Sequence, residues 1–189
     1  MWTTKGARFS ASRRNKIQHE LSSQTLEYLS AYLIIVGLLS AYKIEIPGLK
    51  YENHVTFILT ALSILILIFS HFETSKEYAI KSEKFHQCSL EVGELYNRLR
   101  MVKTFSHIVN KEKKISKISK KYDKVLHKYD NHNPIDFAMF KTTKPGYFKL
   151  SWLDVKLIKL QYYIMTQLKY HVFIYLPAII LTVIILSNI

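Results

Sequence analysis

Three long apolar segments without charged residues, set apart by strongly basic polar stretches, constrain this chain more than any other feature. They cover Tyr28–Tyr42, Val55–Phe72 and Tyr170–Ile189. A helix needs roughly 20 mostly apolar residues to cross a bilayer, and the first segment reaches that length when it is extended to Leu26 and Ile46. This segregation predicts an all-α membrane protein. A buried pair of helices in a soluble protein is the alternative for the first two segments.

The first two apolar segments predict a helical hairpin in the membrane, because a short polar connection with Pro47-Gly48 as its turn separates them. Lys and Arg favour the cytoplasmic side of a membrane. The connection carries Lys43 and Lys50, whereas more basic residues flank the hairpin. We therefore expect a multi-pass protein whose N-terminus and post-hairpin region are cytoplasmic. The flanking residues are Lys5, Arg8, Arg13, Arg14 and Lys16 before the hairpin, and Lys76, Lys81, Lys84, Arg98 and Arg100 after it.

The third apolar segment is expected to cross the bilayer as well, with basic residues only before it. A re-entrant or protein-packed helix is the alternative. Ser151 followed by Asp154 is typical of a helix N-cap, so a helix is predicted to begin there and continue into this segment. The sequence of residues 131–146 predicts an irregular linker. The expected divisions are a hairpin with a stalk helix (1–110), a basic helix with linker (111–150) and a C-terminal helix (151–189).

Apolar residues recur every seven positions after the hairpin, at Tyr78, Phe85, Val92 and Leu99. Residues seven apart lie on one face of a helix. This heptad stripe predicts a long cytoplasmic stalk helix that packs along a partner helix or along a second copy in a homo-oligomer. The N-terminal stretch before the first apolar segment has a weaker stripe and is a candidate partner helix.

A second cytoplasmic helix is predicted from Lys111 to Tyr129, where apolar residues interleave with many lysines at helical spacing. Three interpretations of its basic face stay open. The face is solvated, or it adheres to anionic lipid headgroups, or it binds the phosphates of RNA or DNA. The lysines expected to contact an anionic partner are Lys113, Lys117, Lys120, Lys121 and Lys124.

Polar and small residues inside the hairpin are candidate functional positions. Hydroxyl groups on one face of the second segment could line a pore or join helices by hydrogen bonds. Two carboxylates at corresponding edges of the segments could border a cation path or pair with basic neighbours such as Lys76. Small residues of the first segment form a helix-packing seam. The pore-lining candidates are Thr56, Thr60, Ser63, Ser70, Glu27 and Glu73, and the seam is Ser30, Gly37 and Ala41.

No catalytic, cofactor or metal site is predicted. The five glycines are dispersed, and the sequence has no nucleophile elbow, phosphate loop or zinc-ligand pattern. Cys88 is the single cysteine and cannot form an internal disulfide. With His86 alone it supplies too few ligands for zinc, so we expect His86 to pack or to hydrogen-bond. The chain is therefore not expected to be an enzyme.

Arg13-Arg14 precede the first apolar segment, a short connection leads to the second, and a patterned helix follows at once. This arrangement resembles the SLATT family, two-transmembrane effector domains associated with SMODS nucleotidyltransferases and SLOG sensors. The resemblance covers roughly Ala7–Met101. Its further matching residues are Glu73, Tyr78, Lys81, His86, Leu95 and Tyr96.

The resemblance implies an effector in the bacterial inner membrane that forms pores and kills or arrests an infected cell. The basic region and the third apolar segment are similar to a branch associated with reverse transcriptases. That similarity implies a partner made of a reverse transcriptase with its non-coding RNA and msDNA, and a cyclic-nucleotide signalling system is the other implied partner. A membrane tether or scaffold that localises a nucleic-acid-containing complex is the competing function.

Overall fold

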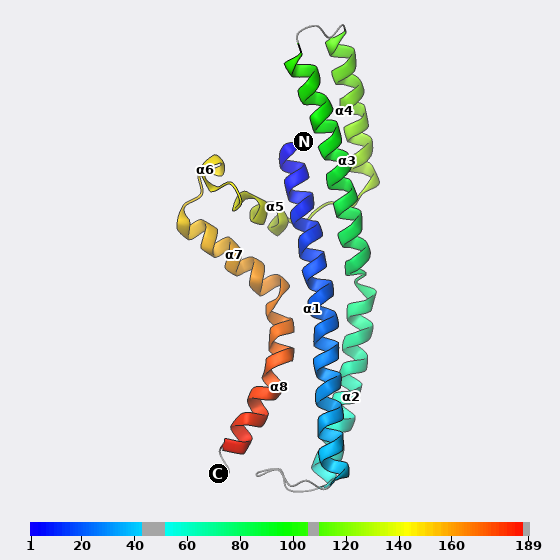
Figure 1. The fold of residues 1–189 in the computed structure, drawn as a ribbon, viewed down its shortest axis with the longest axis vertical. Helices are drawn as coiled ribbons and strands as arrows, with labels where there is room; N and C mark the ends of the chain where they lie inside the picture. The colour runs from blue at the N-terminus through cyan, green and yellow to red at the C-terminus, as the bar shows by residue number, and fades with distance from the viewer. Residues whose placement is uncertain (43–51, 106–109, 187–189) are drawn as a thin grey trace. The chain divides into compact units, whose positions relative to one another are not determined.

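The structure, a computed structural model, describes residues 1–42, 52–105 and 110–186 (Figure 1). These residues form helices and no strand, which confirms the predicted all-α class. The predicted Pro47-Gly48 turn and the end of the third apolar segment (187–189) lie outside the described residues. The helices are α1 (Trp2–Ala41), α2 (Glu52–Ser75), α3 (Tyr78–Thr104), α4 (Lys111–Lys128), α5 (Pro134–Lys141), α6 (Pro145–Phe148), α7 (Trp152–Thr166) and α8 (Leu168–Leu186).

The chain divides into two compact units, and helix α1 contributes residues to both. The polar unit consists of residues 1–17 and 78–163, and the apolar unit of residues 18–77 and 164–189. Helix α1 continues through this boundary without a break. Between α2 and α3 the helix is interrupted at Glu77, whose φ of 50° lies in the left-handed region.

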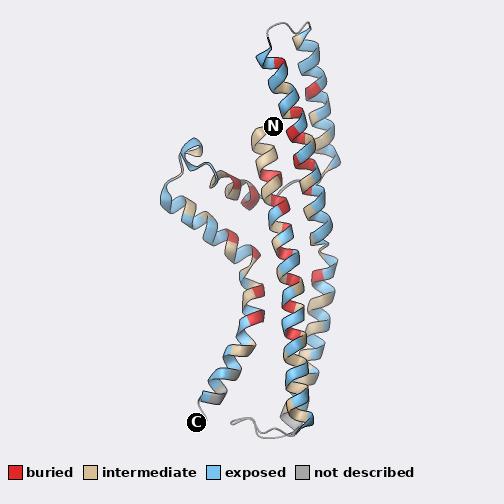
Figure 2. Ribbon diagram, in the orientation of Figure 1, coloured by how far each residue is buried: buried red, intermediate tan, exposed pale blue. Residues whose placement is uncertain are grey.

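The apolar unit exposes side chains that a soluble protein would bury. On α2, Phe57 is 73% exposed and Leu67 is 70% exposed. Helix α1 and the helical segment that begins at Val55 are long and apolar enough to cross a membrane, and no residue in the apolar stretch of the latter is buried. Figure 2 shows exposed residues along most of α2 and toward the C-terminal end of α8. A buried soluble pair would show the reverse pattern, so this surface is that of a membrane protein.

Helix α7 begins at the predicted N-cap. The Ser151 hydroxyl accepts a hydrogen bond from the Asp154 amide at 3.2 Å, and the Asp154 carboxylate accepts one from the Ser151 amide at 2.8 Å. The predicted continuation into the apolar segment is interrupted at Gln167, because the amides of Tyr170 and His171 both donate to its carbonyl in a turn. The 19 residues of α8 rise about 28 Å at 1.5 Å per residue, close to the bilayer core of about 30 Å.

Helix α3 buries its heptad stripe inside the polar unit. Phe85 and Val92 are buried, and Tyr78 and Leu99 are half-buried. Helix α4 packs on α3 through a cluster that includes Ile118, while its lysines from Lys113 to Lys128 stay exposed. This packing confirms the predicted amphipathic helix, because one face is apolar and covered and the other is basic and exposed.

The N-terminal part of α1 covers α3, which confirms the prediction that it is a partner helix. The ring of Phe9 meets His86 edge-on at a centroid distance of 5.5 Å. Nearby, the Ser82 hydroxyl donates a hydrogen bond to the Ser12 carbonyl at 2.9 Å. The predicted packing role of His86 is therefore confirmed as well.

The prediction of an irregular linker over 131–146 was wrong, because helix α5 lies within it. Asn133 accepts a hydrogen bond from the Ile135 amide at 3.1 Å, and its own amide donates to the Asp136 carboxylate at 3.0 Å. This reciprocal capping box, with Pro134 at the first helical position, starts the helix.

An aromatic cluster fastens α5 and α6 to the start of α1. Trp2 contacts Phe140 edge-on at 5.3 Å and stacks on Phe148 at 6.1 Å. Gly6 makes this approach possible, since a Cβ atom at that position would lie 2.1 Å from the Phe140 ring.

Candidate functional site

The predicted pore-lining hydroxyls lie on the exposed surface of α2. Thr56, Thr60 and Ser63 are exposed, and Ser70 is half-buried. The Thr60 hydroxyl donates to the Thr56 carbonyl at 2.9 Å, and the Ser63 hydroxyl donates to the Leu59 carbonyl at 2.8 Å. Because the helix backbone satisfies these two donors, the row of hydroxyls can face lipid at low cost and can still offer oxygen atoms to water.

The small-residue seam of α1 is not covered by the described part of the chain. Ser30 and Gly37 are half-buried and Ala41 is exposed. A Cβ atom built on Gly37 would meet nothing within 4 Å. At Gly37 the seam therefore has room for a further helix beside the described residues.

Glu27 lies at a shallow cavity of the apolar unit. The cavity has a volume of about 440 Å³, and its lining includes Gln24, Glu27 and Tyr28 of α1 with His171 and Tyr175 of α8. The Glu27 side chain is exposed there. Its carboxylate thus faces an open space between two helices rather than a packed interface.

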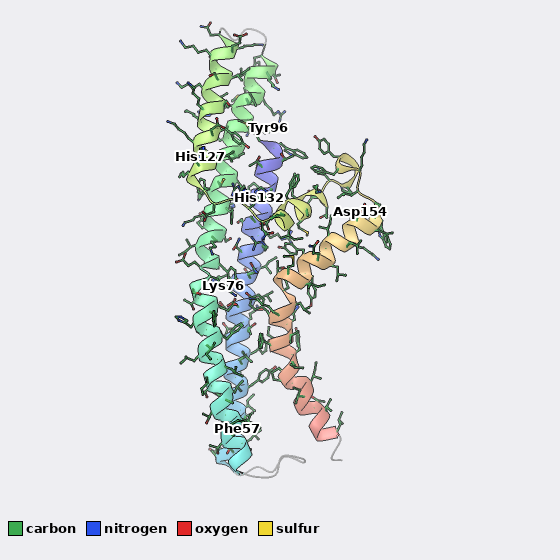
Figure 3. The ribbon with its side chains drawn as sticks, turned by 180° about the vertical axis from the view of Figure 1, so that it is seen from behind. Phe57, Lys76, Tyr96, His127, His132 and Asp154 are labelled. Atoms are coloured by element: carbon green, nitrogen blue, oxygen red, sulfur yellow. The ribbon has the colours of Figure 1, made fainter. Side chains whose placement is uncertain are left out.

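Glu73 has the opposite environment, since it is buried and holds α8 against α2. Its Oε1 atom accepts from Lys76 Nζ at 2.6 Å and from Lys169 Nζ at 2.8 Å. Its Oε2 atom accepts from the hydroxyl of Tyr170 at 2.6 Å, and Tyr170 is fully buried. Lys76 is labelled in Figure 3 near the end of α2. Three donors around one carboxylate keep it charged in a buried place.

We call these four residues, Glu73, Lys76, Lys169 and Tyr170, the Glu73 latch. A pair of Glu73 with a basic neighbour such as Lys76 was one of the two interpretations of this carboxylate, and the structure contains that pair. The partners from α8 were not predicted, because they lie 96 and 97 residues further along the chain. The only local signal was a Lys-Tyr pair at the start of the third apolar segment.

Two further contacts attach α8 inside the apolar unit. The Tyr32 hydroxyl donates to the Ile174 carbonyl at 2.9 Å, and the rings of Phe69 and Phe173 lie 5.3 Å apart. Pro177 stands inside α8 and has no amide hydrogen, so it weakens the helix at this level. Helix α8 is thus held by a few specific contacts.

In the polar unit, the heptad stripe is already occupied by α1 and α4 of the same chain. Association of two copies through Phe85 and Val92 would require one of these helices to leave α3. By contrast, Lys113, Lys117, Lys120, Lys121 and Lys124 of α4 are exposed in the folded chain.

Glu91 ties the end of α4 to α3. Its Oε1 atom accepts from Lys128 Nζ and from the Tyr129 hydroxyl, both at 2.7 Å. These hydrogen bonds from Lys128 and Tyr129 hold the pKa of the Glu91 carboxyl below its ordinary value of 4.5. Tyr129 is therefore engaged within the chain rather than presented to a base.

A buried ion pair that the sequence did not reveal fastens α5 to α1. Arg14 donates from Nε to Asp136 Oδ1 at 2.7 Å and from Nη2 to Oδ2 at 3.1 Å. Asp136 is fully buried. Burial raises the pKa of Tyr162 on α7, and the Asp136 carboxylate adds to this effect. Arg14 thus has a structural role in the polar unit.

A family model described as SMODS and SLOG-associating 2TM effector domain family 5 matches residues 1–186. No curated protein matches the chain. No solved structure matches it either.

Proposed function

Because the chain belongs to family 5 of the SMODS and SLOG-associating 2TM effector domains, a family of antiphage defence effectors, we propose that it acts by permeabilising the bacterial inner membrane. In this proposal the N-terminus and the polar unit are cytoplasmic, α1, α2 and α8 cross the bilayer, and the leak stops the growth of an infected cell. The action is physical rather than catalytic.

The row of exposed hydroxyls on α2 supports the proposal most directly. Thr56, Thr60 and Ser63 are exposed on a helix whose other side chains are strongly apolar. In a single chain these residues face lipid. When several copies assemble, the same row can border a narrow wet path, since the hydroxyl oxygens remain able to accept hydrogen bonds. The uncovered seam at Gly37 offers a place where copies can meet.

The Glu73 latch is the proposed restraint on this assembly. It holds α8 against α2 in the described conformation. A regulator can shift the chain toward the leaking state only if it binds the two conformations unequally. In this proposal the two conformations differ in whether α8 is attached to α2, because breaking a few polar contacts would release α8.

The basic face of α4 is the proposed contact for the regulator. Five exposed lysines on one helix favour a partner rich in phosphate, and a complex of reverse transcriptase, non-coding RNA and msDNA fits this chemistry. A cyclic-nucleotide signalling system is the alternative partner. Glu substitutions at Lys113, Lys117, Lys120 and Lys124 should abolish binding of the ribonucleoprotein, whereas Glu at Lys81 and Lys84 on α3 should not.

The second candidate function is a membrane tether that localises a nucleic-acid-containing complex. The same exposed lysines favour it, because a tether needs only a membrane anchor and a binding face. A tether, unlike a pore, should not depend on the hydroxyls of α2.

The experiment is leakage of a fluorescent dye from liposomes that contain the purified chain. The substitutions Thr56→Val, Thr60→Val and Ser63→Ala, made together, remove the hydroxyls with little change in shape and should abolish leakage. The control is Thr182→Val, because Thr182 is an exposed α8 residue that bonds its own helix at 2.8 Å. Equal leakage from the triple variant and the control would refute the pore, and absence of leakage even from Glu73→Gln, which weakens the latch, would favour the tether.

A further inference from the structure

The polar unit contains a cavity that neither the membrane function nor the basic face of α4 uses. It lies where the N-terminal part of α1 meets the end of α4 and the segment before α5, and its volume is about 470 Å³. This volume is within the usual range for small-molecule sites, about 300–1,000 Å³. Figure 3 labels two of its lining residues, His127 and His132. The lining also includes Thr4, Arg8, Tyr122 and Tyr129.

Arg8 is the unusual residue of this cavity. Its relative exposure is only 3%, and its Nε and Nη1 atoms have no hydrogen-bond partner among the described residues. The third nitrogen, Nη2, makes a long contact of 3.4 Å to the Asn131 side chain, and the guanidinium lies 5.6 Å from the centre of the Phe85 ring. Burying a charged guanidinium group without a carboxylate partner costs free energy, and a bound anion would offset that cost.

A second unpartnered atom lies at the same place. His132 Nδ1 is buried and has no hydrogen-bond partner among the described residues. Burial lowers the pKa of His132, the charge of Arg8 lowers it further, and the carboxylate of Asp136 acts in the opposite direction. The neighbouring carboxylate of Asp136 does not neutralise Arg8, because it accepts both hydrogen bonds from Arg14.

The rest of the cavity lining supplies hydrogen-bonding and aromatic groups, together with a single acidic residue, Asp123. The Thr4 and Tyr122 hydroxyls bond each other at 2.8 Å, and Tyr122 is half-buried. Asp123 is exposed, so water screens its charge far more than that of the buried Arg8. Arginine suits phosphate oxygens in particular, because its planar group donates several parallel hydrogen bonds.

We propose that this cavity binds a phosphate group of a small ligand, with Arg8 as the principal anion contact and His132 beside it. The volume is larger than an inorganic phosphate needs, so the cavity leaves room for a group attached to the phosphate. The proposal does not rest on the proposed leak, because all the residues that line the cavity belong to the polar unit. A soluble phosphate monoester and a phospholipid headgroup share the required chemistry.

The test is thermal unfolding of the full chain in phosphatidylcholine nanodiscs with AMP or inorganic phosphate, at constant ionic strength. Binding of either phosphate compound should raise the midpoint temperature of unfolding. The substitution Arg8→Gln should weaken AMP binding by about tenfold or more, the loss of one charged hydrogen bond. The control Arg98→Gln removes the same charge from an exposed pair with Glu94 and should leave binding unchanged.

Nanodiscs that contain phosphatidylglycerol distinguish the two ligand sources. A rise with AMP in phosphatidylcholine nanodiscs identifies a soluble ligand, and an Arg8-dependent rise only with phosphatidylglycerol identifies a headgroup. If Arg8→Gln does not fold, His132→Gln takes its place and should weaken binding several-fold. No rise with any of these phosphates, or the same rise in the Arg8 and Arg98 variants, would overturn the proposal.

Discussion

At the scale of residues, two buried carboxylates hold segments that are far apart in the sequence. Asp136 fixes α5 to α1 through both oxygens, and Glu73 fixes α8 to α2 through three donors. A buried charge of this kind is stable only while its partners are in place. Each carboxylate is therefore a point at which one substitution should detach one helix.

The ion pair of Arg14 with Asp136 gives a prediction about stability. Asp136→Asn leaves the Arg14 charge without its counter-charge and should lower the free energy of unfolding by about 3–5 kcal/mol. Thermal unfolding in detergent micelles measures the loss. Glu94→Gln breaks the exposed pair with Arg98 and should cost at most about 1 kcal/mol. Equal midpoints for the two variants would show that the buried pair does not hold α5.

The low pKa of Glu91 predicts how the attachment of α4 depends on pH. A carboxyl whose pKa is lower in the folded state stabilises that state above its ordinary pKa of 4.5, and this contribution disappears as pH falls through the folded pKa. Glu91→Gln should therefore lower the thermal midpoint at pH 7, and the difference from the wild type should shrink as the pH falls below 4.5. The midpoints of both proteins between pH 3 and 8 check this. A difference that grows toward acid would contradict it.

At the scale of elements, local patterns predicted α2, α4 and the start of α7. Hydropathy marks α2, alternating lysines and apolar residues mark α4, and Ser151 with Asp154 marks the cap of α7. Helix α5 was missed because it has only 8 residues, and its apolar residues follow one another almost without interruption instead of recurring at helical spacing. The α8 half of the Glu73 latch could not be predicted, because nothing local pairs residues nearly 100 positions apart.

The contact of α1 with α5 makes Gly6 sensitive to substitution. A Cβ atom at Gly6 would collide with the Phe140 ring, which Trp2 already confines. Gly6→Ala should lower the free energy of unfolding by about 1–3 kcal/mol through overpacking. Gly37→Ala on the same helix meets no atom within 4 Å and is the matched control. Equal thermal midpoints for the two variants would contradict the packing described for the aromatic cluster.

At the scale of the whole molecule, one continuous helix belongs to both units. Helix α1 carries the candidate phosphate site and the Arg14 ion pair in the polar unit, and the small-residue seam in the apolar unit. A ligand or partner that acts on the polar unit is therefore connected to the membrane helices through an unbroken backbone.

The most direct test of the proposed leak is the membrane potential of bacteria that produce the chain from a tightly controlled promoter. Glu73→Gln weakens the latch and should depolarise cells quickly, before viability falls and at lower expression than the wild type. Adding Thr56→Val, Thr60→Val and Ser63→Ala should restore the potential at equal membrane levels. An intact potential with Glu73→Gln present in the membrane, or depolarisation unaffected by the loss of these hydroxyls, would contradict the account.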